Sequence, residues 1–204
     1  MAAILDVISS MLFGGTLFMI ILTSNEIATE TQATYNGDMF VQELLTNTAQ
    51  LVEGEFRNMG FNVPQVLPSI TRADSTAISF LTDLDRDGTI DTVKYTLGNI
   101  TELPETPNEL DCLLKRQVNN DPVMSVGAVT VFHLSYLTKE GVRIPSPVPH
   151  DRLGEVRMVE VTMEVQNPYA PARTASMVKS GERTALYSSS LWQQTRLSSQ
   201  NTRR

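Results

Sequence analysis

The first 23 residues carry the feature that most limits the fold of this chain, an apolar run with a single charged side chain. Residues 4–23 read ILDVISSMLFGGTLFMIILT, in which Asp6 is the one charge. As an α-helix this run is about 28 Å long, close to the hydrocarbon thickness of a bilayer, about 30 Å. A buried helix of this length needs a large protein around it, and the chain has only 204 residues. We therefore predict a helix that projects into lipid or into a bundle of like helices.

A second helical signal follows the apolar run. Apolar residues recur at intervals of three and four, as expected for the buried face of an amphipathic helix. This stripe consists of Val41, Leu45, Ala49, Val52, Phe56 and Met59, and it is broadened by Phe40, Leu44 and Leu51. Gly60 and Pro64 are typical stop signals at its C-terminal end. One helix is therefore predicted over about residues 3–58.

Beyond Pro64 the apolar pattern changes to the alternation of β-strands. Strands are predicted at 77–83, 89–97, 126–138, 156–165 and 183–192, and proline-rich loops at 144–150 and 167–172. The first two strands flank the segment Asp85-Arg-Asp-Gly88, whose Asp-Gly pair is a strong signal for an antiparallel hairpin. The fold class is therefore α+β. The hydrophobic half of the long helix projects, and its amphipathic half packs on an antiparallel β-sheet.

These patterns divide the chain into four segments. In chain order they are the hydrophobic transmembrane or bundle-forming helix 1–27, the amphipathic half of the same helix 28–60, an antiparallel sheet domain 61–196 and a flexible tail 197–204. The tail is predicted because its residues are mostly polar, and a polar chain end without a core partner is a usual place for disorder. The first segment finds no apolar partner elsewhere in the chain, so its partner must lie outside it.

The charge distribution excludes one class of partner. A nucleic-acid-binding surface needs clustered lysine and arginine. The chain has a net charge of -7 at pH 7 and no such cluster, so nucleic acid is not expected to bind. The first basic residue is Arg57. Since a secretory signal peptide begins with a basic region, we expect either that a leader preceded Met1 or that the apolar segment inserts by another route.

Asp6 is informative because an unpaired carboxylate inside hydrocarbon costs several kcal/mol. A carboxylate near the start of a helix can meet the α-amine of a neighbouring copy when like helices stagger in a bundle. The alternative is that the Asp6 side chain reaches the membrane interface close to the chain start. Gly14 and Gly15 are weak points of the same helix. We expect them to let it unwind locally when it moves between lipid and a bundle.

An acidic segment between two predicted strands has the spacing of a calcium-binding loop. Asp83-Leu-Asp-Arg-Asp-Gly-Thr-Ile-Asp91 places carboxylates at loop positions 1, 3, 5 and 9 and a backbone carbonyl at position 7. Lys94 stands at position 12, where an EF-hand has glutamate, so a full EF-hand is not predicted. Two interpretations stay open. One is an acidic hairpin turn, and the other is a Ca²⁺ site with the ligands Asp83, Asp85, Asp87, Thr89 and Asp91.

No catalytic set is recognisable in the sequence. The two histidines, His133 and His150, lie in a predicted strand and beside a proline-rich loop. Cys112 is the sole cysteine and is expected to be a small core side chain. The sequence contains no Cys/His cluster with zinc spacing, no glycine-rich phosphate loop and no G-x-S-x-G motif. We predict that the chain is not an enzyme and that Ca²⁺ is the one cofactor to consider.

Taken in order, these features resemble the type IV pilin family, which includes the subunits of type II secretion pseudopili. The shared features are an apolar N-terminal helix with an acid near its fifth position, a Gly-Gly pair and an amphipathic continuation into a sheet. The likeness is nearest to PilW-type minor pilins and J-type pseudopilins. It rests on Arg57-Asn-Met-Gly-Phe61, the acidic hairpin 83–95, the strand and turn 132–141, the valine-rich strand 156–165 and Thr-Ala-Leu-Tyr-Ser-Ser-Ser at 184–190.

The resemblance implies a structural subunit, a pilin or minor pilin, that assembles through its hydrophobic helix with Asp6, Gly14 and Gly15 as assembly residues. The implied partners are other copies of the chain, other pilin-like subunits and the pilus or type II secretion machinery. The implied location is the bacterial inner membrane, crossed once, and then an extracellular or periplasmic filament. The alternative is a single-pass membrane-anchored ectodomain that binds a ligand, with Ca²⁺ at residues 83–91.

Overall fold

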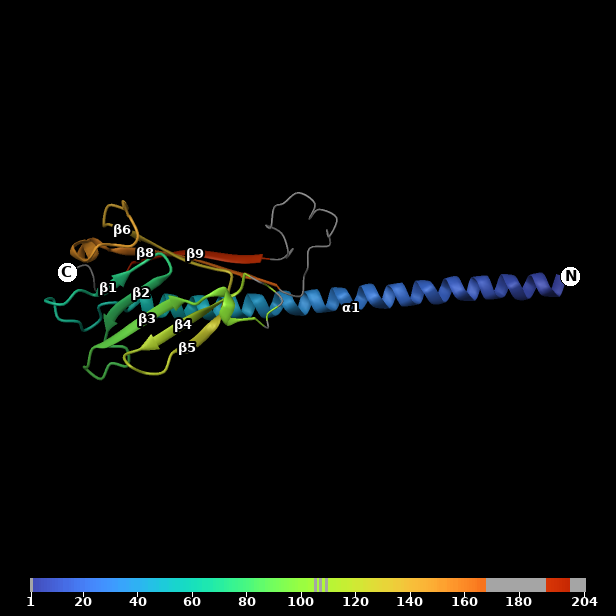
Figure 1. Ribbon diagram of the computed structural model, residues 1–204, viewed down its shortest axis with the longest axis horizontal. Coiled ribbons are helices and arrows are strands. Elements are labelled where there is room, and N and C mark those ends of the chain that lie inside the picture. The colour runs from blue at the N-terminus through green and yellow to red at the C-terminus, as the bar shows by residue number, and fades with distance from the viewer. Residues whose placement is uncertain (1, 105, 107, 109, 168–189, 199–204) are drawn as a thin grey trace.

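One long helix and two antiparallel sheets make up the protein, as seen in a computed structural model that describes residues 2–104, 106, 108, 110–167 and 190–198. The C-terminal half of the helix lies among the strands, and its N-terminal half extends away from them (Figure 1). The N-terminus therefore lies at the far end of the molecule from the sheets. The predicted α+β class and the projecting helical half are confirmed.

The helix α1 spans Ala2–Arg57 and is unbroken over its 56 residues. At 1.5 Å per residue it is about 84 Å long. It passes through Gly14, Gly15 and Gly37 without a break. The predicted helix at residues 3–58 is thus confirmed to within one residue at each end.

The amphipathic half of α1 buries the face that its apolar period predicted. The six residues of the predicted stripe all belong to the hydrophobic core: Val41, Leu45, Ala49, Val52, Phe56 and Met59. Phe40 and Leu51 lie outside the core, with 61% and 39% of their surface exposed. Phe56 packs edge-to-face against Phe80 and Tyr95, with ring centroids 5.5 Å apart in both pairs. The helix is therefore the central element of the core rather than a cover on it.

The first sheet is a five-stranded antiparallel meander. Its strands, in both chain and spatial order, are β1 (Ile70–Ala73), β2 (Ala77–Thr82), β3 (Asp91–Leu97), β4 (Cys112–Val118) and β5 (Met124–Val129). The predicted hairpin is confirmed, since β2 pairs with β3 from Ala77↔Thr96 to Thr82↔Asp91. A short 3₁₀ helix, η1 (Ile100–Glu102), lies between β3 and β4. The sequence did not predict β1 or β4.

The second sheet has four antiparallel strands in the order β7-β6-β8-β9. Their bounds are β6 (Val131–Leu137), β7 (Arg143–Ile144), β8 (Met158–Gln166) and β9 (Ser190–Ser198), and a 3₁₀ helix, η2 (His150–Glu155), lies before β8. The predicted strand at 156–165 corresponds to β8 and is confirmed. Of the proline-rich loop predicted at 144–150, Ile144 instead ends β7 and His150 begins η2. The α1 helix contacts β8 and β9 of this sheet and β5 of the other.

The single strand predicted at 126–138 is wrong. The chain leaves the first sheet after β5 and joins the second at β6, with Thr130 as the crossing point. The Thr130 N–H donates to the Glu164 carbonyl at 2.8 Å, so the backbone turns toward β8 at this residue. An alternating pattern cannot reveal the break because both strands place apolar residues on the core.

The predicted start of the flexible tail at residue 197 is also wrong. Leu197 pairs with Val159 in β9 and exposes only 2% of its surface. Its apolar side chain extends the core, and the strand continues to Ser198. The strand predicted at 183–192 overlaps β9 only at 190–192, and its first part lies outside the described residues. The loop predicted at 167–172 and the segment 184–190 lie almost entirely outside them as well.

Candidate functional site

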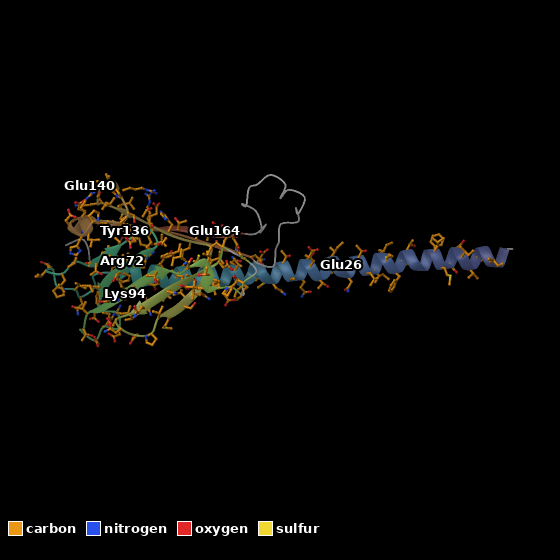
Figure 2. The ribbon with its side chains drawn as sticks, in the orientation of Figure 1. Glu26, Arg72, Lys94, Tyr136, Glu140 and Glu164 are labelled. Carbon is orange, nitrogen blue, oxygen red and sulfur yellow. The ribbon has the colours of Figure 1, made fainter. Side chains whose placement is uncertain are left out.

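The N-terminal half of α1 presents its apolar side chains to the outside. Each of the following exposes between 49% and 74% of its surface: Ile4, Val7, Ile8, Met11, Leu12, Phe13, Leu17, Phe18, Met19, Ile20, Ile21 and Leu22. Figure 2 shows side chains standing out from this half of the helix, with Glu26 labelled where the half approaches the sheets. Within the described chain, α1 is the one helix long and apolar enough to cross a membrane. We call residues 4–22 the apolar rod.

The apolar surface of the rod runs all the way round the helix. Residues 17–22 are consecutive apolar residues, and successive residues in a helix point about 100° apart. Burying twelve such side chains at about 1.5–3 kcal/mol each stabilises by roughly 20 kcal/mol or more. The net stability of a domain is only about 5–15 kcal/mol. The rod therefore requires an apolar environment that the described part of this chain does not provide.

Asp6 lies on this exposed surface near the free end of the rod. Among the described residues, no cation forms an ion pair with its carboxylate. Gly14 and Gly15 lie halfway along the rod, and a Cβ atom built on either would meet no atom within 4 Å. No contact among the described residues therefore requires glycine at these positions. Small residues of this kind permit the close approach of two helices in general.

A polar stretch of helix separates the apolar rod from the sheets. Residues 24–33 carry Glu26 and Glu30 and are exposed. The threonine hydroxyls in this stretch form hydrogen bonds within the helix: those of Thr29 and Thr31 donate to the carbonyls of Asn25 and Ile27 at 2.9 and 2.7 Å. These ten residues span about 15 Å along the helix axis. This stretch therefore separates the folded domain from the apolar rod.

The domain begins at a specific contact between α1 and the segment after β8. Asn167 is fully buried, and its side-chain amide donates to the Thr34 carbonyl at 3.1 Å and to Asp38 Oδ1 at 2.8 Å. The Asn167 side chain occupies the space beside Gly37, where an added Cβ would lie 2.3 Å from Asn167 Oδ1. Gly37 is therefore the position at which the segment after β8 packs directly against the backbone of α1.

The predicted calcium loop forms the turn between β2 and β3. Oxygen atoms of Asp83, Asp85 and Asp87 lie within 4.8 Å of one another. Asp83 exposes only 4% of its surface, whereas the other two are exposed. Gly88 adopts φ +90° and Arg86 φ 64°, which turn the backbone so that alternate side chains face one point. The structure thus brings three of the five predicted ligands together.

The carboxylate of Asp83 is only half satisfied. Its Oδ2 accepts from the side-chain amide of Asn62 at 2.9 Å and from the Gly88 N–H at 3.2 Å. Its Oδ1 is buried and accepts no hydrogen bond from the described residues. Asn62 lies just beyond α1, so this carboxylate also ties the hairpin to the end of the helix. An oxygen in this condition is uncommon, because buried polar atoms are almost always hydrogen-bonded.

The exposed aspartates of the loop are held by its backbone. The Asp87 N–H donates to Asp85 Oδ1 at 3.2 Å, and the Thr89 N–H donates to Asp87 Oδ1 at 2.7 Å. The Thr89 hydroxyl also donates to Asp87 Oδ1. These Thr89 donors favour the charged form and lower the pKa of Asp87 from its usual value. Asp87 is therefore anionic at neutral pH.

Asp91 does not join the other carboxylates. Its Oδ2 accepts from the Leu84 N–H at 3.1 Å, and its Oδ1 accepts from the Asn119 side-chain amide at 2.7 Å. The Thr89 hydroxyl is directed to Asp87 rather than left free. Asp91 closes the loop onto the turn between β4 and β5. Sequence patterns did not identify Asn62 and Asn119 as part of this loop, although their positive φ values of 57° and 51° suit asparagine.

The other candidate residues lie apart from these two regions. His133 and His150 are exposed, and Cys112 is buried, as expected for a core side chain. A pocket is lined by residues 60–70 together with Leu153, Gly154, Val156 and Arg157, and Arg157 is the one ionisable side chain among these residues. The Arg157 guanidinium donates to the carbonyls of Gly154 and Val156, at 2.8 and 3.3 Å.

Comparisons of the chain with models of known protein families, with curated proteins and with solved structures found no match. The assignment of a function therefore rests on the apolar rod, on Asp6 within it and on the geometry of the domain.

Proposed function

We propose that this chain is a structural subunit of a type IV pilus-like filament, a pilin or minor pilin, which assembles through the apolar rod. The observation that carries the proposal is the complete ring of exposed apolar side chains on residues 4–22. Their transfer out of water is worth more than the stability of the whole domain. Lipid before assembly, and the rods of neighbouring subunits afterwards, would both provide the necessary surroundings.

Asp6 favours a bundle of rods over permanent residence in lipid. An unpaired carboxylate within hydrocarbon is unfavourable, and near the end of a helix it is relieved only by reaching the interface or by pairing with a cation. In a bundle of staggered helices, the α-amine of a neighbouring copy can pair with the Asp6 carboxylate. Such a pair forms at one stagger only, so it would set the register of the subunits as well as neutralise the charge.

Gly14 and Gly15 support the same assembly. Without hydrophobic exclusion between helices in lipid, association relies on close van der Waals packing, which small residues permit. The absence of side chains at these glycines, with nothing within 4 Å of a Cβ built there, would let a neighbouring helix approach the backbone. The same pair would allow the helix to unwind locally while it is withdrawn from the membrane, since each glycine weakens a helix by about 1 kcal/mol.

The domain also carries an exposed apolar area next to α1. A shallow groove beside the helix is lined in part by Leu44, Leu51, Met124 and Val126. Met124 exposes 61% of its surface, and Phe40 lies on the neighbouring turn of the helix with 61% exposed. Lateral contact between the domains of adjacent subunits would cover these side chains while the rods pack together.

Neutralising Asp6 tests the proposal. We expect Asp6→Asn to reach the membrane at the normal level and to lose filament incorporation by about tenfold or more, because it removes one partner of a desolvated charge pair. Asp6→Glu, which keeps the charge, should retain most of the incorporation. Glu26→Gln is the matched control in the polar stretch of the same helix. Quantification of the chain in membranes and in sheared surface filaments gives the answer, and normal incorporation of Asp6→Asn would contradict the proposal.

A second function is a single-pass membrane-anchored ectodomain that binds a ligand, with the rod as a permanent anchor. The observation in its favour is the pocket between residues 60–70 and 153–157. In this case copies of the chain would not polymerise. Electron microscopy of sheared surface material separates the two functions, because only the first yields filaments that antibodies against the domain decorate.

A further inference from the structure

The loop between β2 and β3 concentrates negative charge without neutralising it. Residues 83–91 contain four aspartates and one arginine. The guanidinium of Arg86 lies over the Phe61 ring, 5.7 Å from its centroid. Among the residues that the structure describes, none forms an ion pair with Asp83, Asp85 or Asp87. Three like charges within 4.8 Å of one another repel, so this arrangement favours a cation.

Turn geometry explains only part of the loop. It accounts for the bonds from Asp87 N–H to Asp85 and from Thr89 to Asp87, which are local turn contacts. It does not account for Asp83 Oδ1, which is buried and lacks a donor in the described chain. The desolvation of an unsatisfied carboxylate oxygen is unfavourable unless another group compensates for it. The Asp83 carboxylate lies in the same cluster as those of Asp85 and Asp87, so one cation shared by the three side chains would compensate for this desolvation.

We infer that Asp83, Asp85 and Asp87 bind one Ca²⁺ ion at the β2–β3 turn. The chemistry of the ligands selects the metal, because all three offer hard carboxylate oxygens and no histidine or cysteine takes part. Ca²⁺ accepts six to eight oxygen ligands in flexible geometry, whereas Mg²⁺ demands a near-ideal octahedron. The exposed side of the loop leaves room for water to complete the shell. Asp91, whose two oxygens are already engaged, remains a structural residue of the turn.

The ion would join three parts of the domain. Asp83 is bound to Asn62 in the turn after α1, and the Asp83 N–H donates to the Phe61 carbonyl at 3.0 Å. Asp91 connects the same loop to Asn119, between β4 and β5. A cation at Asp83 would therefore stabilise the end of α1, the β2–β3 hairpin and the β4–β5 turn together. The inference is independent of polymerisation and applies equally to a permanently anchored ectodomain.

Calorimetry on the full chain in detergent micelles tests the inference. After removal of divalent ions with a chelator, titration with CaCl₂ should show one ion bound per chain, with a dissociation constant of about 10⁻⁴–10⁻³ M as in extracellular modules. Saturating Ca²⁺ should also raise the melting temperature, because the ion binds only the folded chain. MgCl₂ at the same concentration should give a clearly smaller shift.

Asp85→Asn is the decisive variant because Asp85 is exposed and its loss does not threaten the core. It should weaken Ca²⁺ binding by about tenfold or more, since it removes one of three charged ligands. Asp151→Asn, an exposed aspartate in η2, is the matched control and should bind as the unchanged chain does. The absence of both heat and a melting shift at about 10 mM Ca²⁺, far above the expected constant, would overturn the inference. Equal binding by Asp85→Asn and Asp151→Asn would also overturn it. Either result leaves the Asp6 experiment unaffected.

Discussion

Glu55 is a buried acid on the core face of α1, and two residues of the first sheet satisfy it. Arg116 Nη2 donates to Glu55 Oε1 at 2.5 Å, and Arg116 Nε lies 2.9 and 3.0 Å from the two carboxylate oxygens. The Tyr95 hydroxyl donates to Glu55 Oε2 at 2.5 Å. The side chains of Arg116 and Glu55 are only 16% and 9% exposed. This network fixes the angular position of α1 against β3 and β4.

Breaking the Glu55–Arg116 pair should be far more damaging than breaking an exposed pair on the same helix. Arg116→Met leaves a buried carboxylate without its cation and should lower the free energy of unfolding by about 3–5 kcal/mol. Arg57→Met removes an exposed arginine whose pair with Glu53 spans 3.6 Å, and should cost at most about 1 kcal/mol. Urea unfolding of both variants measures the difference. Similar losses in the two variants would show that the burial of Glu55 does not matter.

Tyr95 should make the protein sensitive to alkali. Burial, and then the negative charge of Glu55, raise the pKa of Tyr95 well above its ordinary value of 10.0. Above about pH 10 the unfolded chain loses this proton and the folded chain keeps it, so stability falls as the pH rises. Urea midpoints measured between about pH 8 and 11 should show the fall, which Tyr95→Phe should reduce. Tyr35→Phe, at a tyrosine that is 64% exposed, should leave the fall unchanged.

The acidic loop shows what the spacing of residue types can predict about a site. The alternation of Asp83, Asp85 and Asp87 with Gly88 left two interpretations open, an acidic turn or a Ca²⁺ site, and the structure places oxygen atoms of these three aspartates within 4.8 Å of one another. Asp91 has the same spacing but lies outside this cluster, because Asn119, remote in sequence, donates to its side chain. The burial of Asp83 depends on the turn after α1, which the spacing of aspartates does not encode. The local spacing of aspartates therefore indicates that a cluster can form. Contacts with residues remote in sequence determine which of the aspartates belong to it.

At the scale of elements, Gly37 should be the least replaceable glycine of α1. Gly37→Ala would push a methyl group into the Asn167 side chain, which is buried and holds Thr34 and Asp38. We expect a loss of about 1–3 kcal/mol in unfolding free energy, since Asn167 can move only by giving up these hydrogen bonds. The measurement is chemical unfolding followed by circular dichroism.

Gly54→Ala is the control for this substitution. Gly54 lies in the same helix and is exposed, and a Cβ atom there meets nothing within 4 Å. Alanine should therefore stabilise the helix at this position by about 0.5–1 kcal/mol. Opposite signs for the two variants are expected. Stabilisation by Gly37→Ala would mean that the contact with Asn167 does not hold the helix.

The sequence predicts some elements better than others, because their apolar residues repeat with different regularity. The helix α1 was predicted nearly to the residue because its apolar stripe repeats over many turns. Strand β4 was missed because Lys115, Arg116 and Gln117 interrupt its alternation, and Arg116 faces inward only to meet Glu55. Strand β1 is too short, at four residues, to show a period. A periodic signal cannot report a polar side chain whose partner lies elsewhere in the chain.

At the scale of the whole molecule, the apolar rod and the domain should be separable. A chain of residues 28–204 keeps Thr34, Gly37, Asp38 and the whole buried stripe, so it should be a monomer in water without detergent. The full chain should need detergent, because the rod exposes apolar side chains on all sides. Sedimentation velocity measures both states. A chain of residues 42–204, which lacks Val41 and the partners of Asn167, is the matched control and should unfold at lower urea. Association of 28–204 in water would contradict the prediction.

The unbroken course of α1 has a mechanical consequence. A force applied near the N-terminal end of α1 would be transmitted along one continuous helix to residues 34–57, which lie between the two sheets. The load would then act parallel to the helix axis, so the contacts on both sides would resist sliding simultaneously instead of peeling apart one after another. Under such a force, the contacts between α1 and the two sheets would be strained before any single strand separated from its neighbours.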